Sequence, residues 1–493
     1  MAIAVVALSV TAAVASAGVK EVMIVGHNPP PATYPKYVHY FTTIQAAVDA
    51  ATRPRDFVLI EPGTYEEEVK VRPANAGIFI RGMDRNTVIL DGTNIHPAGG
   101  ANGIEVLQTN EIWIENLTVA NFERETLDGP GGNEIFWNGK PASGAEKVGA
   151  HGWFGNYLTA YDTGLNGGYG IFTKDEKRGE WDNIYASGFN DSGMYLGGCP
   201  ECEAVITHAT MEYNALGYSG SNSGGQVIIE NSKFNHNTTG VAPNTENPGD
   251  GPPPQNGACR EAEPGHKRHK PLHGSNHQGP WEGKLQVFKT TNINHCTIIE
   301  NNQVNDNGDL TLPANPSTAA APWGVGVELP GDYGDLVLNN EIKRNPTDGV
   351  LAFEYPNPFE ANLNFPPGTV FAQNAGNRVE GNEFGENGFI GGKEFVGDIA
   401  FQGGLFGQQR STNNCVSDNV TPDPNYPAEI NVVLGCQNET TPNPGGGVPF
   451  LFYLLELQEE SENRPPAEPV GPPPAQETMP NPCEGVPANP LCR

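Results

Sequence analysis

Basic residues are scarce in this chain of 493 residues. It carries 28 Lys and Arg against 58 Asp and Glu, for a formal net charge of −30 at pH 7. A field of that sign repels nucleic acids and anionic membrane surfaces. It also repels polyuronates, unless Ca²⁺ or a local basic patch intervenes. We therefore expect no nucleic-acid partner.

Long hydrophobic runs are missing too, apart from the first residues, MAIAVVALSVTAAVASA. No other stretch approaches the roughly 20 apolar residues that a transmembrane helix needs, so we expect no membrane span. The N-terminal run ends in the small residues Ala15-Ser16-Ala17, which predicts a signal peptide over residues 1–17. A buried strand or helix is the alternative. The predicted location is secreted or at the cell surface.

The cysteines agree with an oxidising compartment, since the chain has 8 of them. Cys483 and Cys492 lie close together in the sequence, and we expect them to pair. Cys199-Pro-Glu-Cys202 could form a corner disulfide, half of a metal site or two free thiols. No second Cys-x-x-Cys is present, so a zinc site has little support.

A repeat occupies residues 168–242, and each of its units ends on Asn. One glycine per unit recurs at intervals of 23, 24 and 23 residues. These glycines are Gly170, Gly193, Gly217 and Gly240. A period in the low twenties, with short alternating apolar runs, is typical of a solenoid with one turn per repeat. A single turn cannot bury its apolar face, so neighbouring turns must stack strand on strand in parallel sheets.

The Leu-x-x-Leu-x-Leu pattern of leucine-rich repeats is absent. The Asn residues suit sharp corners, because Asn tolerates left-handed backbone and can hydrogen-bond its copy in the next turn. We therefore predict an all-β fold, a right-handed, single-stranded parallel β-helix. Degenerate copies of the repeat extend this pattern to about residue 420.

The solenoid is predicted to span residues 57–440, with insert loops at 123–166 and 243–286. Before it, residues 18–56 form a lead-in segment. Its FTTIQAAVDAA run (41–51) has the apolar spacing of a short helix. Such a helix would cap the open end of the solenoid, where bare strand edges would otherwise favour aggregation.

After the solenoid, residues 441–493 form a Pro-rich and mostly irregular tail. Its apolar stretch 449–458 is predicted to dock on the solenoid as a strand or short helix. The residues after it are expected to be disordered or tied down by a disulfide. We expect the protein to be a monomer.

The stretch from 41 to 92 resembles a known family. F-x-T-I-Q-x-A-V-x-A-A followed by P-G-T-Y-x-E-x-V-x-V looks like the opening of pectin methylesterases and other members of the pectin-lyase-like superfamily. The resemblance implies a secreted right-handed β-helix with a sugar-directed role. It carries over no catalytic residue, because the Q-D-T-L, D-F-I-F-G and L-G-R-P-W segments of the esterases are missing. The N-T-D and R-I-K segments of polygalacturonases and the D-P-H of mannuronan epimerases are missing as well.

The insert over 243–286 gathers histidines and basic residues. Imidazoles at such spacing can ligate Zn²⁺ or Cu²⁺, and a basic cluster in so acidic a chain could attract a uronate or sulfate group. A solvated linker is the alternative. The candidate metal ligands are His266, His269, His273 and His277. The candidate substrate-binding residues are Arg260, Lys267 and Arg268.

Outward aromatic residues form a second candidate site. If the residue after each repeat glycine points inward, the next points outward, which stacks Phe172 beside Tyr195 on the outer face. Flat aromatic rungs give sugars an apolar platform, and Lys174 and Arg178 follow closely in the sequence. Resemblance to lyases of this fold implies a Lys or Arg base, with acidic groups or Ca²⁺ neutralising a uronate. Alternatively, the loop at 123–166 covers these rings as an accessory core.

An acidic set is the third candidate. Paired carboxylates about 5–9 Å apart could catalyse glycoside hydrolysis, or they could hold Ca²⁺ together with backbone carbonyls. Chance grouping in an acidic chain is the alternative. The set consists of Glu328, Asp332, Asp335 and Glu354, of which Glu328 and Glu354 are the catalytic candidates.

Two functions follow. The chain is either a polysaccharide lyase or glycoside hydrolase acting on an extracellular polysaccharide, or a non-catalytic β-helix that binds or decorates a cell surface. A metal-binding periplasmic β-helix is a variant of the second. Fold alone does not choose between them.

Overall fold

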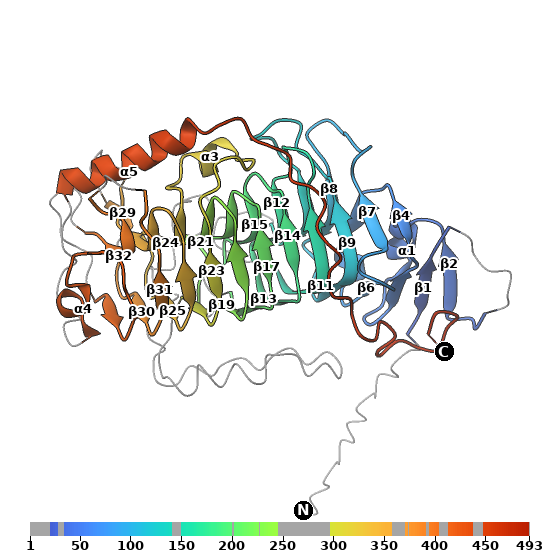
Figure 1. Cartoon of the computed structure of the whole chain (residues 1–493). Helices are drawn as coiled ribbons and strands as arrows, with labels where there is room; N and C mark the ends of the chain where they lie inside the picture. The colour runs from blue at the N-terminus through green and yellow to red at the C-terminus, as the bar shows by residue number, and fades with distance from the viewer. Residues whose placement is uncertain are drawn as a thin grey trace, which may run out of the picture.

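The computed structural model describes residues 20–27, 34–140, 149–199, 202–225, 227–244, 296–356, 370–372, 374–390, 394–403, 413–436 and 447–492. The strands stack side by side into one elongated solenoid (Figure 1). They belong to a 21-stranded sheet, called sheet A here, and an 11-stranded sheet, called sheet B. Within both sheets every printed pairing is parallel, and the predicted parallel β-helix is confirmed.

Sheet A consists of two ladders, A1 and A2, because two long strands, β9 (Ile112–Ala120) and β11 (Ala150–Tyr161), belong to both. The other strands of A1 are, in chain order, β1 (Val22–Val25), β2 (Val38–Phe41), β3 (Phe57–Ile60), β6 (Phe79–Gly82), β13 (Glu176–Asp182), β16 (Ala204–Thr207), β19 (Val227–Glu230), β22 (Thr297–Glu300), β25 (Leu336–Leu338), β30 (Arg378–Glu380) and β33 (Cys415–Ser417). The other strands of A2 are β4 (Gly63–Tyr65), β7 (Val88–Asp91), β14 (Tyr185–Ser187), β17 (Thr210–Glu212), β20 (Lys233–Asn235), β23 (Gln303–Asn305), β26 (Glu341–Lys343) and β31 (Glu383–Gly385).

Sheet B forms the third side of each turn. Its strands are β5 (Val69–Val71), β8 (Asn102–Leu107), β10 (Asn133–Asn138), β12 (Tyr169–Lys174), β15 (Ser192–Gly197), β18 (Leu216–Ser221), β21 (Thr239–Asn244), β24 (Val325–Pro330), β27 (Asp348–Phe353), β32 (Gly397–Phe401) and β34 (Asn425–Tyr426). A small antiparallel pair, β28 (Tyr355–Pro356) and β29 (Val370–Ala372), lies outside the solenoid sheets.

The repeat glycines form the predicted column in sheet B. A Cβ atom on Gly170 would come within 2.5 Å of the Gly193 carbonyl oxygen, and one on Gly217 equally close to that of Gly240. No side chain fits at such a distance, which explains why the repeat demands glycine here. The residue that follows each glycine points into the core, as Ile171 does.

Buried Asn side chains connect successive turns at the corner between ladder A2 and sheet B. The side-chain amide of Asn214 donates to the Oδ1 atom of Asn237 at 3.1 Å, and Asn237 donates to Asn307 at 3.2 Å. The series continues through Asn345 and Asn387. Each amide also donates to a backbone carbonyl in the interior, so the ladder satisfies polar groups that water cannot reach. The predicted hydrogen bonding between Asn copies is confirmed.

Replacing Asn237 with alanine is expected to lower the free energy of unfolding by about 2–4 kcal/mol, because buried partners lose their hydrogen bonds. The side-chain oxygen of Asn237 accepts from the Asn214 backbone N–H at 3.1 Å, and its amide donates to the Met211 carbonyl at 3.0 Å. Urea unfolding followed by circular dichroism measures the change. The control is Asn94→Ala at an exposed position, which should have little effect. Equal stability of the two variants would contradict the structural role of the ladder.

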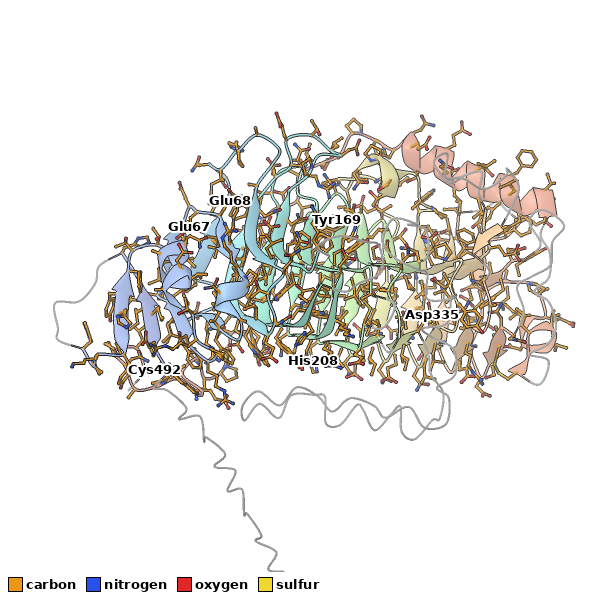
Figure 2. All side chains as sticks on the ribbon, turned by 180° about the vertical axis from the view of Figure 1, so that it is seen from behind. Glu67, Glu68, Tyr169, His208, Asp335 and Cys492 are labelled. Carbon is orange, nitrogen blue, oxygen red and sulfur yellow. A yellow bond between two sulfur atoms is a disulfide. The ribbon has the colours of Figure 1, made fainter. Side chains whose placement is uncertain are left out.

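The predicted cap helix is present as α1 (Ile44–Ala50), which buries Ile44, Ala47 and Val48 against the first turns. Its first backbone N–H groups donate to the Glu67 carboxylate, at 2.7 and 2.9 Å. Figure 2 labels Glu67 beside this end of the solenoid. The remaining short helices are the 3₁₀ turn η1 (Pro73–Asn75), α3 (Pro316–Ala319) and α4 (Ile430–Val433).

The prediction of an insert loop over 123–166 is wrong for most of that stretch. Strand β10 pairs in register with β8 and β12, and β11 pairs in register with β9 and β13. Strands β10 and β11 of this stretch therefore belong to the solenoid, whereas residues 123–132 form an irregular segment. The Gly and Trp residues of the stretch conceal the strand pattern, because Trp137 and Trp153 are fully buried in the central core. The insert predicted at 243–286 lies outside the described residues from residue 245 onward.

Helix α5 (Gly447–Glu462) lies along the outer face of sheet B at the C-terminal turns (Figure 1). The stretch predicted to dock as a strand or helix is thus helical. Its buried side chains, among them Phe450, Leu454 and Leu457, pack on Val325 and Leu351 of β24 and β27. The hydroxyl of Tyr453 donates to the carboxylate of Asp348 at 2.7 Å.

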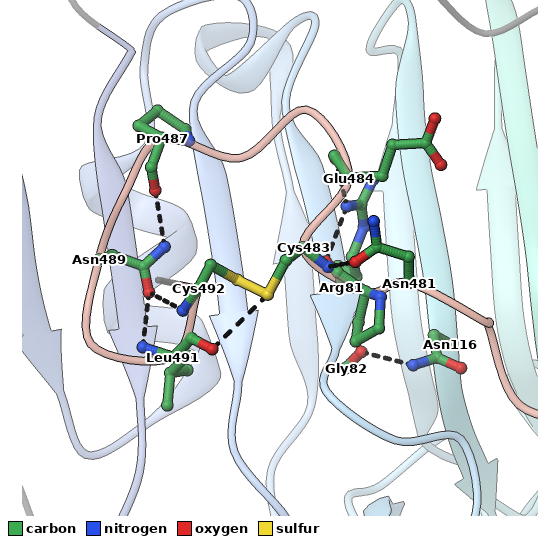
Figure 3. The surroundings of a disulfide bond; sticks show 11 residues. Arg81, Gly82, Asn116, Asn481, Cys483, Glu484, Pro487, Asn489, Leu491 and Cys492 are labelled. Carbon is green, nitrogen blue, oxygen red and sulfur yellow. Dashed lines mark hydrogen bonds between the residues drawn. A yellow bond between two sulfur atoms is a disulfide. The ribbon is translucent and has the colours of Figure 1, made fainter.

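From the end of α5, near the middle of the solenoid, the chain runs as an extended strap, residues 463–492, to the first turns (Figure 1). The predicted Cys483–Cys492 disulfide closes its end. Figure 3 shows this disulfide beside Arg81, whose Nη1 donates to the carbonyls of Pro482 and Glu484 at 2.9 and 2.8 Å. The tail is therefore tied down, the second of the two predicted alternatives.

The strap covers a column of aromatic rings on the outer face of ladder A1. Phe57 stacks on Phe79 with ring centroids 4.8 Å apart, and Phe79 stacks on Trp113 at 5.3 Å. Trp113 stacks in turn on Phe154 at 3.9 Å. Side chains of the strap, including those of its two cysteines, pack against the first of these rings. The strap thus excludes water from an apolar face that would otherwise be open.

Candidate functional site

The outer face of sheet B carries a cluster of rings in consecutive turns. Phe136 of β10, Phe172 of β12 and Tyr195 of β15 are paired in register. The rings of Phe136 and Phe172 stack at 4.1 Å with an interplanar angle of 2°, and Tyr195 meets Phe172 edge-on at 4.9 Å. We call these three rings, with Tyr169 packed against them, the aromatic cluster.

The hydroxyl of Tyr169 connects the aromatic cluster to two charged side chains. The guanidinium carbon of Arg124 lies 5.1 Å from the centre of the Tyr169 ring. The tyrosine hydroxyl donates to the carboxylate of Asp191, the residue before β15. Asp191 also accepts from the Asn315 amide at 2.7 Å and from the Ser192 hydroxyl at 2.9 Å. Figure 2 labels Tyr169 on this side of the molecule.

Local structure holds Arg124 in place. Its Nη1 and Nε atoms donate to the carbonyls of Leu127 and Gly131, at 3.0 and 3.3 Å, within the irregular segment that follows β9. Asn315 is fixed as the N-cap of α3, where its side chain accepts from the N–H groups of Ser317 and Thr318. Three segments distant in the sequence therefore meet over the start of β12.

Burial shifts the proton affinities of this set. It raises the pKa of Asp191, while the Arg124 charge and the hydrogen bonds from its neighbours act in the opposite direction. Burial and then the Asp191 charge raise the pKa of Tyr169 well above its usual value. The tyrosine is thus a neutral donor to a carboxylate whose charge Arg124 balances. Such a group can donate a proton or orient a polar ligand.

The predicted outward aromatic pair, Phe172 and Tyr195, does point out of the solenoid, but the two residues are only 7% and 6% exposed. Ring edges rather than ring faces therefore reach the surface, which agrees with the alternative of an accessory core. Lys174 ends the same strand as Phe172 and pairs with Gly197. Arg178 belongs to β13 of sheet A, where its Nε bonds the Glu203 carboxylate at 2.8 Å. The two predicted bases thus lie on different sheets.

The acidic candidates occupy different structural positions. Glu328 is paired with Leu351, one turn on, and faces outward in the column that contains Phe172. Glu354 follows β27 and is fully buried, and Asp332 is 4% exposed. Asp335 occupies an asparagine-ladder position, where its Oδ1 accepts from the Thr297 backbone N–H at 2.9 Å.

The candidates in the predicted insert lie outside the described residues. These are Arg260, His266, Lys267, Arg268, His269, His273 and His277. Among the residues that are described, one set of three potential metal ligands has its donor atoms within 4.8 Å of one another: Glu380, Cys415 and Cys436. Its two cysteines form a disulfide and therefore offer no thiolate.

Cys199 and Cys202 form a disulfide, which settles the three alternatives for that motif. Every cysteine that the structure describes is disulfide-bonded. Disulfides persist in oxidising compartments, so this finding favours a location outside the cytoplasm. No helix within the described ranges is both long enough and apolar enough to cross a bilayer.

Sequence reasoning missed Arg124, Tyr169, Asp191 and Asn315. The sequence does hold one signal. Tyr169 directly precedes the repeat glycine Gly170, and Asp191 comes two residues before Gly193, so the repeat fixes the place of both residues in their turns. Neither Arg124 nor Asn315 belongs to the repeat. Nothing in their local sequence indicates that they converge on the same turn.

A scan against models of protein families finds none that matches the chain, and a search of curated protein sequences finds no match either. Solved structures do resemble it. The A-module of the mannuronan C-5 epimerase AlgE4 of Azotobacter vinelandii is 13% identical with a TM-score of 0.41, over 76% of this chain and 89% of that one. An alginate lyase from Paenibacillus is 13% identical with a TM-score of 0.35, over 78% and 93%.

A surface adhesin is also among the similar structures. The surface adhesin PfbA of Streptococcus pneumoniae is 9% identical with a TM-score of 0.34, over 76% of this chain and 84% of that one. Such scores are too low to carry an argument about activity. The class that the strand pairing itself defines is the parallel β-helix.

Proposed function

We propose that this chain is an extracytoplasmic β-helix protein that binds an extracellular polysaccharide at the aromatic cluster of sheet B. One observation carries the proposal: the Tyr169 hydroxyl lies between Arg124 and Asp191 at the edge of stacked rings. Sugar sites combine apolar ring surface with a few fixed polar groups that orient hydroxyls. The cluster offers ring edges and fixed polar side chains on one face.

The charge of the protein favours a polysaccharide that is not densely anionic. A formal net charge of −30 repels polyuronates at long range. Within the cluster, Asp191 balances the charge of Arg124, so no uncompensated cation awaits a carboxylate. A polyuronate would need Ca²⁺ as a bridge, which oxygen-rich sites of this kind can hold.

Catalysis on the polysaccharide, by a lyase or a glycoside hydrolase, is the second candidate. The hydrogen bond from Tyr169 to Asp191 favours it, because a proton donor coupled to a buried carboxylate is the pairing that general acid–base chemistry uses. Lys174 and Glu328 lie on the same outward face and are further candidates for proton transfer. The outer face of sheet B would then bind the polysaccharide as a substrate.

Binding is expected to fall at least tenfold in Tyr169→Ala, which removes both the ring and its hydroxyl. Tyr169→Phe keeps the ring packed on Phe172 but removes the hydroxyl, so it should weaken binding less than Tyr169→Ala does and lose any product formation. Calorimetry against neutral and acidic polysaccharides, with and without Ca²⁺, measures binding, and reducing-end and unsaturated-product assays measure turnover. Tyr37→Phe, at the other end of the solenoid, is the control. Unchanged binding by the folded Tyr169→Ala variant would exclude the cluster as the site.

A further inference from the structure

Ladder A2 presents a face that differs from the other two sides of the solenoid. The α5 helix covers the C-terminal turns of sheet B, and the strap covers the first turns of ladder A1. On A2, in contrast, outward side chains are exposed at Lys233, Gln303 and Glu383, and Glu341, in the turn between the last two, is half-buried. A soluble ligand can therefore reach this face along several turns.

A stacked aromatic pair lies at the edge of this face, where each turn passes from A2 into sheet B. The rings of Tyr213 and His236 are 5.5 Å apart with an interplanar angle of 9°. Both residues have left-handed backbone, with φ of 61° and 58°, because they occupy the same corner in consecutive turns. Tyr213 is 38% exposed, and His236 is exposed too. Together they form a flat apolar surface that continues from one turn to the next.

Hydrogen-bonding groups flank the stacked pair at the spacing of the turns. Glu212 of β17 pairs in register with Asn235 of β20, and its carboxylate accepts from the Tyr185 hydroxyl at 3.0 Å. One turn further on, Asn305 donates to Glu341 at 2.7 Å. Carboxylates and amides beside an aromatic platform are suited to the hydroxyl groups of a sugar ring.

The charges of this face exclude a polyanion. Both nitrogen-to-oxygen contacts between Arg344 and Asp306 are 2.6 Å, so that guanidinium is already paired. Lys343 bonds the Glu383 carboxylate and lies 3.6 Å from that of Glu341. The carboxylates of Glu212 and Asp309 surround Tyr213 and add to the desolvation that raises its pKa. Apart from the exposed Lys233, a ligand that approaches the pair therefore meets carboxylates and paired cations, and should itself be uncharged.

We propose that Tyr213 and His236 form a second carbohydrate-binding surface, which holds a neutral glycan chain lying along the solenoid axis. This inference goes beyond the proposed function, because it places a separate site on another side of the solenoid. The polymer would run across consecutive turns, with sugar faces on the two rings and hydroxyls on Glu212 and Asn235. Two surfaces on one rod would let the protein hold a polymer at two points, which raises its overall affinity.

The test measures calorimetric binding of neutral hexasaccharides of glucose, mannose and xylose, with polygalacturonate as the charged comparison. Tyr213→Ala and His236→Ala are each expected to weaken binding of the preferred neutral oligosaccharide at least tenfold, whereas Tyr213→Phe should keep it within about threefold. Phe389→Ala is the matched control, because that ring is 62% exposed elsewhere. Thermal unfolding of each variant verifies that it is folded.

The outcomes separate the two sites. Unchanged binding by a folded Tyr213→Ala variant overturns the second surface, even if Tyr169→Ala abolishes binding at the aromatic cluster. Loss in Tyr213→Ala together with full binding by Tyr169→Ala supports the second surface and contradicts the proposed function. Tighter binding of polygalacturonate than of any neutral oligosaccharide overturns the assignment of the ligand class. A wild-type protein that binds none of these neutral oligosaccharides overturns the second surface.

Discussion

The free energy of unfolding of the Arg81→Met variant is expected to be about 3–5 kcal/mol lower than that of the parent protein. Arg81 is fully buried, and its Nε and Nη2 atoms lie 2.8 and 2.7 Å from the Glu115 carboxylate, which is 1% exposed. Removing the guanidinium leaves a buried carboxylate without its counter-ion. It also leaves two strap carbonyls without their donor. Denaturant unfolding followed by tryptophan fluorescence measures the loss.

Two further variants show whether the pairing, rather than the volume of the side chain, is responsible. Arg81→Met combined with Glu115→Leu removes both charges and should recover most of the loss, because a buried ion pair is worth little more than apolar packing. Arg53→Met breaks the pair with Glu21 at a side chain that is 60% exposed, and should change stability by less than about 1 kcal/mol. Protease cleavage of the strap should rise in both variants that lack Arg81, because its two carbonyls lose their donor in each. A double variant as unstable as the single one would argue against this explanation.

Replacing Asp335 with asparagine is expected to stabilise the protein by about 2–4 kcal/mol at pH 7. Asp335 stands in a ladder with Asn377 and Asn414, in which each backbone N–H donates to the side-chain oxygen of the next turn. The asparagines also donate their side-chain N–H to interior carbonyls, those of Asp332 and Asn374. The Oδ2 atom of Asp335 has no hydrogen-bond partner. Figure 2 labels Asp335 within these turns.

The sign of the pH dependence follows from burial. Desolvation raises the pKa of Asp335 to about 8, so the folded protein holds a proton that the unfolded chain releases near pH 4. The loss in free energy of unfolding that Asp335 causes is therefore absent at pH 4. It grows by about 1.4 kcal/mol per pH unit and levels off near pH 8. The benefit of Asp335→Asn should follow the same course, near zero at pH 4 and largest above pH 8.

The reverse substitution is the control. Asn340, in a neighbouring ladder, donates to the Ile299 carbonyl at 2.8 Å and is 1% exposed. Asn340→Asp should destabilise the protein and should do so more strongly as the pH rises. A gain from Asp335→Asn that is the same at pH 4 and pH 8 would show that proton uptake is not its cause. Differential scanning calorimetry across this range provides both curves.

The repeat made the architecture predictable. Gly170 and its copies form a column because only glycine fits beneath the carbonyl of the next turn, and this spacing constraint is visible in the sequence. The alternation after each glycine correctly assigned Phe172 and Tyr195 to the outer face. It could not predict their exposure, because the segments that cover an outer face do not belong to the repeat.

Long-range contacts explain the failures. Asp191 and Asn315 are 124 residues apart, and Arg81 bonds carbonyls about 400 residues further along the chain. No local sequence pattern encodes these contacts, because they depend on the path that irregular segments take across the folded solenoid. The stretch at 123–166 was misjudged for a related reason. Its Trp153 is fully buried in the central core, where its large ring conceals the strand pattern of the repeat.

Because the strap returns to the first turns, it also determines the end at which an attached anchor would hold the solenoid. Lys20, the first described residue, donates to the carbonyl of Gly485 at 3.2 Å, so the two described chain ends meet at the first turns of the solenoid (Figure 1). An anchor attached before Lys20 or after Cys492 would hold the solenoid at the same end. In either case the opposite end of the solenoid, with α4 and α5, would point away from the anchor.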